Sequence, residues 1–460
     1  MVFDFGGISL SIAAAQRNLS PLPPVGRTLI GGFESTYLPA FGVDGLEVNG
    51  HADHRVADLD SLQQAGVQHL RYPLRWHRIE AEPGSFDWSE TDDVLGHLRD
   101  AGAVVIVDLV HHTCYPDWLS DAFRGPDFAP AFLRFTRAVA ERYPWLPAYT
   151  LLNEPFTTLF FTGQQAFWPP YDSGVAGFTR LMLSVLPALS EAAQCWRELL
   201  PESHHVWVDT AEHHRGIGRG ALAAEVANER RHLVLDLALG RFLDSTRPSV
   251  QSLLECGGDS LMELRPLEVD VLGLDYYCHS EWYYDDHRAW APSPHPVGFA
   301  AIAEQYGERY GLPMMLTETN LRGLPSDRIG WLRYTLEQYE LALSRGVDLR
   351  GYCWFPQVDS CDWDTLLARC RGRADPVGVL SLADDGGRLE SSFTHAWRAV
   401  AAGAPAQELP AYRWQAPNDH HLAGFLPSLG HWPWQEPLPN DRVPAVHIPL
   451  AEPNEREERR

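Results

Sequence analysis

Eight short apolar runs, separated by longer amphipathic segments, constrain the fold of this chain more than any other feature. The runs cover residues 29–33, 69–74, 103–110, 149–154, 205–210, 269–277, 313–319 and 349–355. The segments between them have apolar residues at helical spacing, as in 57–66, 132–143, 233–243 and 329–346. Strands that alternate with helices favour a parallel sheet. Eight such units within residues 29–402 predict a (β/α)₈ TIM barrel.

An open, doubly wound sheet is the alternative architecture. It is disfavoured because no GxGxxG turn follows the first apolar run. Residues 1–28 are interpreted as an irregular leader that ends in a proline-rich stretch. Residues 403–460 form a C-terminal extension without periodicity, which we expect to wrap over the surface and to end in disordered residues. Its Trp432 and Trp434 either cover part of the barrel mouth or pack on outer helices.

Charge and cysteine content exclude several classes of partner. The formal net charge is −24, which argues against nucleic acid or an anionic membrane surface as a partner, since both require a cationic footprint. The seven cysteines are an odd number without a CxxC pair, which argues against a disulfide framework or a zinc site. Reduced thiols fit a cytoplasmic protein best.

No targeting, membrane or metal signal is evident in the sequence. No apolar run reaches the roughly 18 residues of a membrane span, and Asp4 lies where a secretory signal would be positively charged. The histidine pairs 204–205 and 213–214 have no carboxylate or cysteine at convincing ligand spacing. We therefore expect neither a metal nor a cofactor.

Two glutamates lie at the ends of apolar runs, at the positions where barrel enzymes carry their chemistry. The fourth run ends with Glu154 followed by Pro155, and Glu318 is the last residue but one of the seventh run. Most of the 61 acidic residues are expected at the solvated surface, so the position of these two at strand ends singles them out. A pair of carboxyl groups is what glycoside hydrolysis needs: one protonates the leaving oxygen, and the other attacks the anomeric carbon or activates water.

The motifs around these glutamates resemble a known family. Asn153-Glu154-Pro155 resembles the acid/base motif of the clan A retaining glycoside hydrolases. Other segments are similar, in the same order, to family 1, the β-glucosidase family: HLRYPLRWHRIEAEPG (69–84), VDLVHHTCYPDWL (107–119), VLGLDYY (271–277), LTETN (316–320) and GYCWFPQVDSCDWD (351–364). The resemblance implies a retaining β-glycosidase, β-glucosidase-like, that acts on a carbohydrate or glycoside without a cofactor.

The resemblance also implies roles for residues near the reaction centre. Glu154 would be the general acid/base and Glu318 the nucleophile. Arg71 would lie beside Glu318 and keep it ionised, unless it is a structural arginine of the barrel. Asn153 would hydrogen-bond the sugar 2-hydroxyl. Strand alternation puts Tyr277 on the same face as Asp275, so Tyr277 is the candidate to orient Glu318, while a purely structural role for Tyr276 and Tyr277 stays open.

The remaining site residues would bind the sugar. His112 would be the sugar-binding histidine, although the neighbouring His111 allows the register to differ by one residue. Trp354 would be the stacking platform, and Asp362 and Trp363 would line the far end of the glycone pocket, unless Trp363 packs the tail. Glu34 is expected where the family has a glutamine that binds sugar hydroxyls.

Several positions depart from the family pattern. Leu38 follows Tyr37, Asp275 stands where the family has asparagine, and one extra residue separates Trp354 from Asp362. A transglycosidase or an endo-glycanase of the same clan is therefore an alternative, as is a non-catalytic carbohydrate-binding barrel. A separation well beyond about 10 Å between the Glu154 and Glu318 carboxyl groups would exclude the enzyme.

Overall fold

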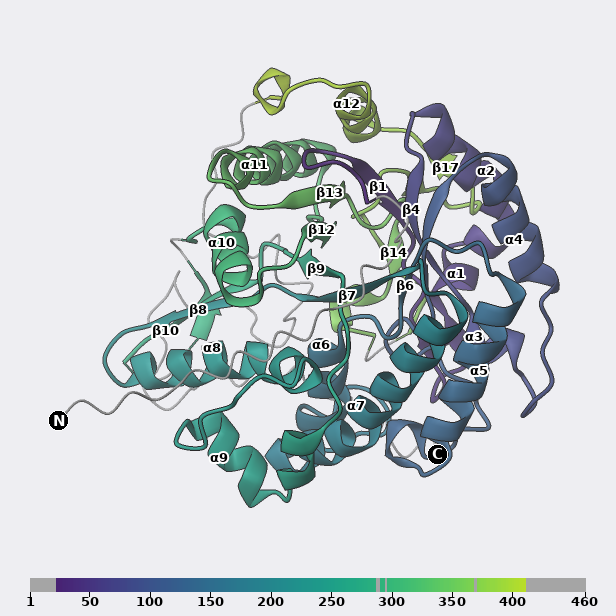
Figure 1. The fold of residues 1–460 in the computed structure, drawn as a ribbon. Helices are drawn as coiled ribbons and strands as arrows, with labels where there is room; N and C mark the ends of the chain where they lie inside the picture. Colours follow the sequence, from purple (N-terminus) through teal and green to yellow (C-terminus); the bar gives the residue numbers. More distant parts are fainter. Residues whose placement is uncertain (1–21, 287–289, 294–295, 368–369, 411–460) are drawn as a thin grey trace.

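A closed barrel of eight parallel strands forms the centre of the molecule (Figure 1). The structure, a computed structural model, describes residues 22–286, 290–293, 296–367 and 370–410. Neighbouring strands follow the order β1-β13-β12-β9-β7-β6-β5-β4. They are β1 Leu29–Gly32, β4 His69–Pro73, β5 Val104–Asp108, β6 Ala148–Thr150, β7 His204–Thr210, β9 Val271–Asp275, β12 Met314–Glu318 and β13 Leu349–Cys353. Each lies within or overlaps a predicted run, so the TIM-barrel prediction is confirmed and the open sheet is wrong.

Helices surround this barrel (Figure 1). The longer ones are α2 His51–Gln64, α4 Ser89–Asp100, α5 Phe128–Arg142, α7 Gly174–Leu199, α8 Arg219–Ala238, α10 Phe299–Tyr310, α11 Pro325–Ser344 and α12 Ser392–Ala401. Short helices are α1 Gly45–Val48, α3 Trp76–Ile79, α6 Pro155–Leu159 and α9 Pro248–Glu255. The predicted helical segment 233–243 ends earlier, at Ala238, because Gly240 takes a left-handed turn with φ 63°.

Small sheets decorate the loops between these elements. One has three strands and lies beside α8 at the left of Figure 1. Its strands are β8 His213–Gly216, β10 Glu281–Tyr284 and β11 Trp290–Pro292. The two-stranded ribbons pair β2 Tyr37–Leu38 with β3 Val43–Asp44, β14 Ser360–Cys361 with β15 Ala374–Asp375, and β16 Ser381–Leu382 with β17 Arg388–Leu389.

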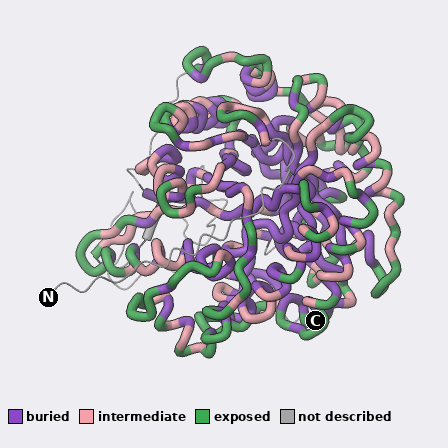
Figure 2. The backbone as a smooth tube through the Cα atoms, viewed as in Figure 1, coloured by how far each residue is buried: buried purple, intermediate pink, exposed green. Residues whose placement is uncertain are grey.

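Apolar side chains pack on both sides of the barrel wall, and the central part of the chain is coloured as buried in Figure 2. One cluster lies in the barrel interior and consists of Ile30, Ile106, Ala148, Val206, Val208, Val271, Met315, Cys353 and Phe355. A second, larger cluster packs the outer strand faces against the helices. The barrel is thus a packed core whose chemistry is confined to the strand ends.

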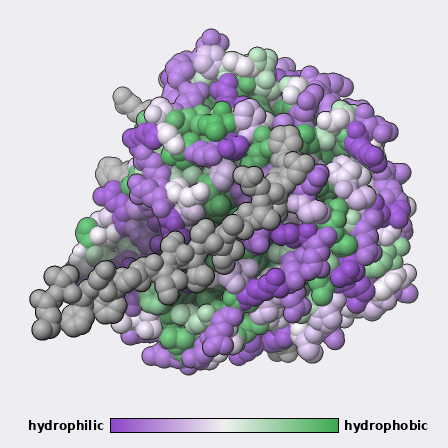
Figure 3. All heavy atoms as spheres, in the orientation of Figure 1, coloured by the Kyte–Doolittle hydropathy of each residue, from purple (hydrophilic) through white to green (hydrophobic). Residues whose placement is uncertain are grey.

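The segments that flank the barrel pack on α11. The Gly26 amide donates to the Leu349 carbonyl over 2.8 Å, and Arg27 donates to the Ala404 carbonyl over 3.0 Å. Residues 411–460, with Trp432 and Trp434, lie outside the described residues, as does most of the leader. The face drawn in Figure 3 is largely hydrophilic, with smaller hydrophobic groups between. None of the described helices has the length and apolar character to cross a membrane.

Candidate active site

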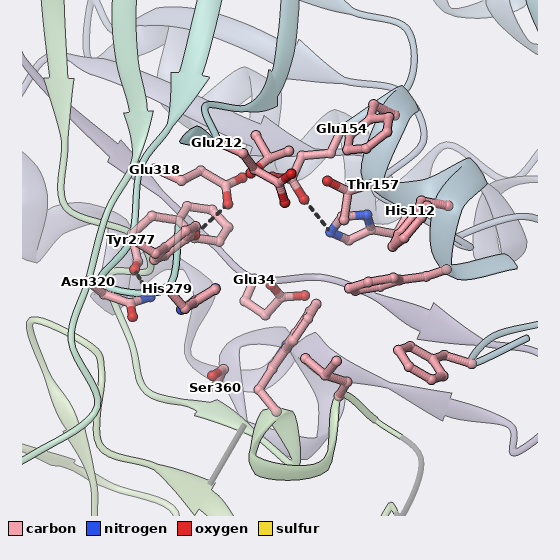
Figure 4. A pocket seen from close by; sticks show the side chains of 18 of the residues that line it. Glu34, His112, Glu154, Thr157, Glu212, Tyr277, His279, Glu318, Asn320 and Ser360 are labelled. Carbon is pink, nitrogen blue, oxygen red and sulfur yellow. Dashed lines mark hydrogen bonds and ion pairs between the residues drawn. The ribbon is translucent and has the colours of Figure 1, made fainter. Parts of the chain in front are cut away.

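The carboxyl ends of the barrel strands open on a cavity (Figure 4). It encloses about 1430 Å³ of space between protein atoms, part of it open to solvent. Glu154 and Glu318 both line it, together with Glu34, His112 and Tyr277. The sequence predicted all of these side chains at the barrel mouth, and the structure brings them together there.

Glu154 is held at the junction of a strand and a helix. Its amide donates to the Val208 carbonyl over 3.0 Å, which ties the end of β6 to β7. Glu154 has φ 43° and ψ 65°, a left-handed conformation that is rare for a residue with a side chain. Pro155 was expected to begin a loop, but it is the first residue of α6, where its missing N–H needs no partner. The Asp209 carboxylate accepts from the Phe156 amide over 2.9 Å and so fixes the start of this helix.

A local irregularity of β12 sets the position of Glu318. The pairing of β12 with β9 shifts register between Leu316 and Glu318, and this shift places Glu318 beside Asp275. Such bulges re-aim side chains at barrel rims. The Thr317 hydroxyl donates to Asp275 Oδ1 over 2.6 Å, while Asp275 Oδ2 is buried without a hydrogen-bond partner. Glu154, Asp275 and Glu318 each offer one oxygen within 4.8 Å of the others.

Arg71 connects Glu318 to Asn153, the residue that precedes Glu154. Its Nη1 donates to Glu318 Oε1 over 2.8 Å, and its Nη2 donates to Asn153 Oδ1 over 2.7 Å. The Tyr277 hydroxyl donates to Glu318 Oε2 over 2.7 Å. Both oxygens of Glu318 therefore have a fixed donor, one of them the cationic guanidinium of Arg71. Tyr276, on the opposite face, donates instead to Glu281 over 2.7 Å.

The environment of Glu154 favours its protonated form. Burial, followed by the nearby carboxyl groups of Asp275 and Glu318, raises the pKa of Glu154 well above its usual range. Burial and Glu318 likewise raise the pKa of Asp275. Arg71 contacts Glu318 directly, so among these three carboxyl groups Glu318 is the one with a paired charge. The site thus combines one stabilised carboxylate with neighbours that keep their protons.

A buried chain of charges runs from Glu34 to Arg71. Burial opposes ionisation of Glu34, but the charge of His111, whose Nε2 lies 3.5 Å from Glu34 Oε2, lowers its pKa to about 2. Burial likewise opposes the charge of His111, but Glu34 and Asp108 raise its pKa to about 10. His111 Nδ1 lies 2.8 Å from Asp108, whose carboxylate is 3.5 Å from Arg71 Nη2. His111 is therefore a cation that bridges two carboxylates behind the cavity wall.

His112, and not His111, lines the cavity, as the predicted register required. Burial and the adjacent His111 charge lower the pKa of His112 well below its usual range, so its ring is neutral. The Thr158 hydroxyl donates to the Asn153 carbonyl, so it accepts from His112 Nδ1 over 2.8 Å. This network assigns the acceptor role to Nε2, which lies 3.7 Å from Glu154 Oε2 and 3.4 Å from Asn153 Nδ2.

Two predicted sugar-binding residues lie elsewhere. Trp354 does not line the cavity: it packs on Phe393 of α12 with ring centroids 4.4 Å apart. Phe355 lines the cavity instead, so the predicted platform is one residue too early in the sequence. When the spacing to Asp362 is counted from Phe355 and not from Trp354, it contains no extra residue relative to the family pattern. Asp362 is also corrected, because its carboxylate is used by the backbone amides of Arg371, Gly372 and Arg373 at 2.7–3.0 Å. Trp363 lines the cavity as predicted.

The sequence did not single out one wall of the cavity. This wall, which we call the aromatic wall, is formed by Phe156, Phe160, Phe161, Trp282 and Tyr284. Titratable residues at the same rim are Glu212, His214 and Arg230, which follow β7 or belong to β8 and α8. Their only sequence signal is their place after the fourth, fifth and sixth runs, which does not distinguish them from other loop and helix residues.

The described residues contain one group with the geometry of metal ligands. It consists of Glu154, Asp275 and Glu318. Carboxylate oxygens suit hard cations, but Arg71 already provides the cation for Glu318. The histidine pairs have other partners: His205 Nδ1 lies 3.0 Å from the Glu268 carbonyl, and His214 Nε2 lies 3.0 Å from Glu212.

Comparison with solved structures finds the same fold in known glycosidases. A β-glucosidase from Thermotoga maritima in complex with azafagomine superposes with a TM-score of 0.66 at 17% identity, over 77% of this chain and 87% of that one. The family 1 β-glucosidase from the same organism gives a TM-score of 0.65 at 17% identity, over 77% and 88%. The chain has the fold of the family 1 β-glucosidases.

Sequence comparison gives a shorter match. No protein-family model matches the chain. The aryl-phospho-β-D-glucosidase BglC of Bacillus subtilis (strain 168) is 38% identical over 77 residues. This stretch is 15% of the present chain and 16% of BglC, so the chain matches only a small part of that relative.

Proposed function

We propose that this protein is a retaining β-glycosidase, β-glucosidase-like, with Glu318 as nucleophile and Glu154 as general acid/base. The observation that carries the proposal is the approach of their carboxyl oxygens to within 4.8 Å in one cavity. Retaining enzymes hold the two carboxyl groups about 5–5.5 Å apart, whereas inverting enzymes leave about 6.5–9.5 Å for a water molecule. The distance also argues against the non-catalytic barrel.

The proposed reaction is a double displacement. Glu318 attacks the anomeric carbon while Glu154 gives its proton to the leaving oxygen, and the glycosidic bond breaks. Glu154, now a carboxylate, takes a proton from water, which attacks the anomeric carbon and releases Glu318. A transglycosidase would use an alcohol in place of water at this second step. Arg71 and Tyr277 hold Glu318 in place throughout.

The walls of the cavity support a small glycone on one side of this pair. Glu34, His112 and Trp363 combine an ionised carboxylate, an imidazole acceptor and an aromatic face. Sugars are bound by such hydrogen-bonding groups together with an apolar ring surface. The names of the similar proteins point to a glucoside. Five of the seven cysteines are buried thiols, which supports a cytoplasmic location.

Mechanism-based labelling tests the proposal. Intact protein is incubated with a panel of 2-deoxy-2-fluoro glycosides of different sugars, and the adduct is located by peptide mass mapping. A sugar on Glu318 is expected in the wild type and in Glu308→Gln, which changes an exposed glutamate of α10. No adduct is expected in Glu318→Gln. An adduct elsewhere, or none together with no hydrolysis of aryl glycosides, contradicts the proposal.

A further inference from the structure

Arg230 of α8 lines the cavity without an anionic partner. It forms neither a hydrogen bond nor an ion pair with any residue in the described part of the chain, and its Nε is buried without an acceptor. Its guanidinium lies 4.6 Å from the centre of the Phe160 ring. Buried polar groups are normally hydrogen-bonded, since an unpaired one is costly. An unpaired guanidinium in a cavity wall therefore indicates a missing acceptor.

The aromatic wall places Arg230 on the leaving-group side of the site. Glu154 immediately precedes α6, and Phe156 lies in this helix. Phe160 begins the π-helical turn that follows, and its ring centre is 5.6 Å from that of Phe156. The row of rings thus starts at the proposed proton donor and ends under Arg230. A leaving group that accepts the proton of Glu154 extends along this row.

The charges around Arg230 leave it unneutralised. Arg231 donates to the Glu212 carbonyl and to the Gln305 side chain, so it has no carboxylate partner either. Burial opposes ionisation of Glu212, but a hydrogen bond from His214 and the two arginines lower its pKa. Burial lowers the pKa of His214, so this ring adds no charge. One carboxylate thus faces two guanidinium groups, in a chain whose net charge is −24.

We propose that the leaving-group side of the cavity binds a flat aromatic group with an anionic substituent, which stacks on the aromatic wall and pairs with Arg230. This inference rests on the proposed glycosidase function and adds a substrate class to it: β-glycosides of hydroxybenzoate-type phenols. The aromatic ring contacts Phe156 and Phe160, and the carboxylate accepts from the guanidinium. A partly buried charge-assisted hydrogen bond of this kind is among the strong ones.

Paired substrates measure the contribution of Arg230. We compare kcat/KM for 4-carboxyphenyl and 4-carbamoylphenyl β-glycosides of the sugar that reacts best, because the two leaving groups have similar shape and differ in charge. The ratio of the two values is taken in the wild type and in Arg230→Gln, so that intrinsic leaving-group reactivity cancels. We expect the ratio to fall at least about tenfold in the variant, or about 1.4 kcal/mol. Arg230→Lys, which keeps the positive charge, should retain part of the preference for the carboxylate substrate.

A matched control and a second anion position make the test specific. Arg215→Gln removes an exposed arginine of β8 outside the cavity and should leave the ratio unchanged. Equal ratios in the wild type and Arg230→Gln would overturn the inference while hydrolysis of the amide substrate still supports the glycosidase. An Arg230 effect confined to a 6-phosphorylated sugar with a neutral phenol would also overturn it, because the anion would then belong to the glycone. Absence of hydrolysis of every glycoside would instead contradict the proposed function.

Discussion

Replacement of Asp275 by asparagine should make the protein more stable, and increasingly so as the pH rises. Asp275 is fully buried beside Glu318, with one oxygen bonded by Thr317 and the other unpartnered. Burial and Glu318 raise its pKa in the folded protein, whereas the unfolded chain has the usual value of about 3.9. The folded state therefore binds a proton that the unfolded state releases above about pH 4. The folded protein must either keep Asp275 protonated or bury a second negative charge beside Glu318, and both lower the free energy of unfolding above about pH 4. Asparagine has no such proton to bind.

The size of the effect follows from the geometry. Two unit charges within 4.8 Å of each other repel by at least about 3.5 kcal/mol at an effective dielectric constant of 20. Up to the folded-state pKa of Asp275, the wild type loses as much as about 1.4 kcal/mol per pH unit relative to the variant. The contributions of packing and of uncharged hydrogen bonds to the free energy of unfolding also differ between the wild type and Asp275→Asn, but this difference does not depend on pH. The slope of the stability difference, and not its offset, is therefore the quantity to measure.

Urea unfolding of both proteins at several pH values between 4 and 8 provides the assay, followed by tryptophan fluorescence. Asp384→Asn, at an exposed position in the turn between β16 and β17, is the control and should give a difference without a slope. The activity of Asp275→Asn should survive, because the amide resembles the protonated acid. A stability difference that stays flat across this pH range would refute the reasoning, since it would mean that Asp275 is ionised in the folded protein.

The other predictions concern the proposed catalytic and sugar-binding groups. Glu154→Gln should lower kcat/KM by about 10²–10⁴-fold on substrates with poor leaving groups. The variant should also lose the alkaline limb of the pH profile, because that limb reports the loss of the proton that Glu154 keeps through its raised pKa. An unchanged alkaline limb in steady-state kinetics would contradict this. Arg71→Met should destabilise the fold by about 3–5 kcal/mol, because it leaves the buried Glu318 charge unpaired, and unfolding curves that match the wild type would disprove it. Trp363→Ala should raise KM for glycosides with little change in thermal stability, whereas Trp354→Phe should lower the melting temperature with KM unchanged; the reverse pattern would restore Trp354 as the sugar platform.

Strand periodicity predicted most of the site because it fixes both the end and the face of each strand. Asp275 and Glu318 end neighbouring strands, and alternation from Asp275 places Tyr277 toward the cavity. The same rule failed at the end of β13, where residues 351–355 carry no charged side chain on either face. A strand that is buried on both sides has no polar alternation to show which side chains face inward. Trp354 and Phe355 could therefore not be distinguished from the sequence.

Other parts of the site depend on loop conformations that carry no periodic signal. Asp362 has φ 62°, and its carboxylate folds back on the amides of the following loop. Asp209 lies inside an apolar run, where a single acid does not reveal that it fixes the start of α6. Arg230 lies on α8, which belongs to the segment between β7 and β9, and the fold of this segment brings Arg230 to the cavity. These positions follow from tertiary packing, which local patterns do not specify.

The buried row Glu34–His111–Asp108–Arg71 has a consequence for how the proposed glycosidase could evolve. Its first member faces the sugar side of the cavity, and its last member holds the proposed nucleophile. Neighbours in such a network are strongly non-additive when mutated. A change at Glu34 that admits a different sugar also leaves His111 with one carboxylate fewer, and the charge balance around Arg71 changes with it. A substitution that changes the sugar preference of the proposed glycosidase is therefore expected to change its reaction rate as well. We expect compensating substitutions on β4 and β5 to accompany such a change.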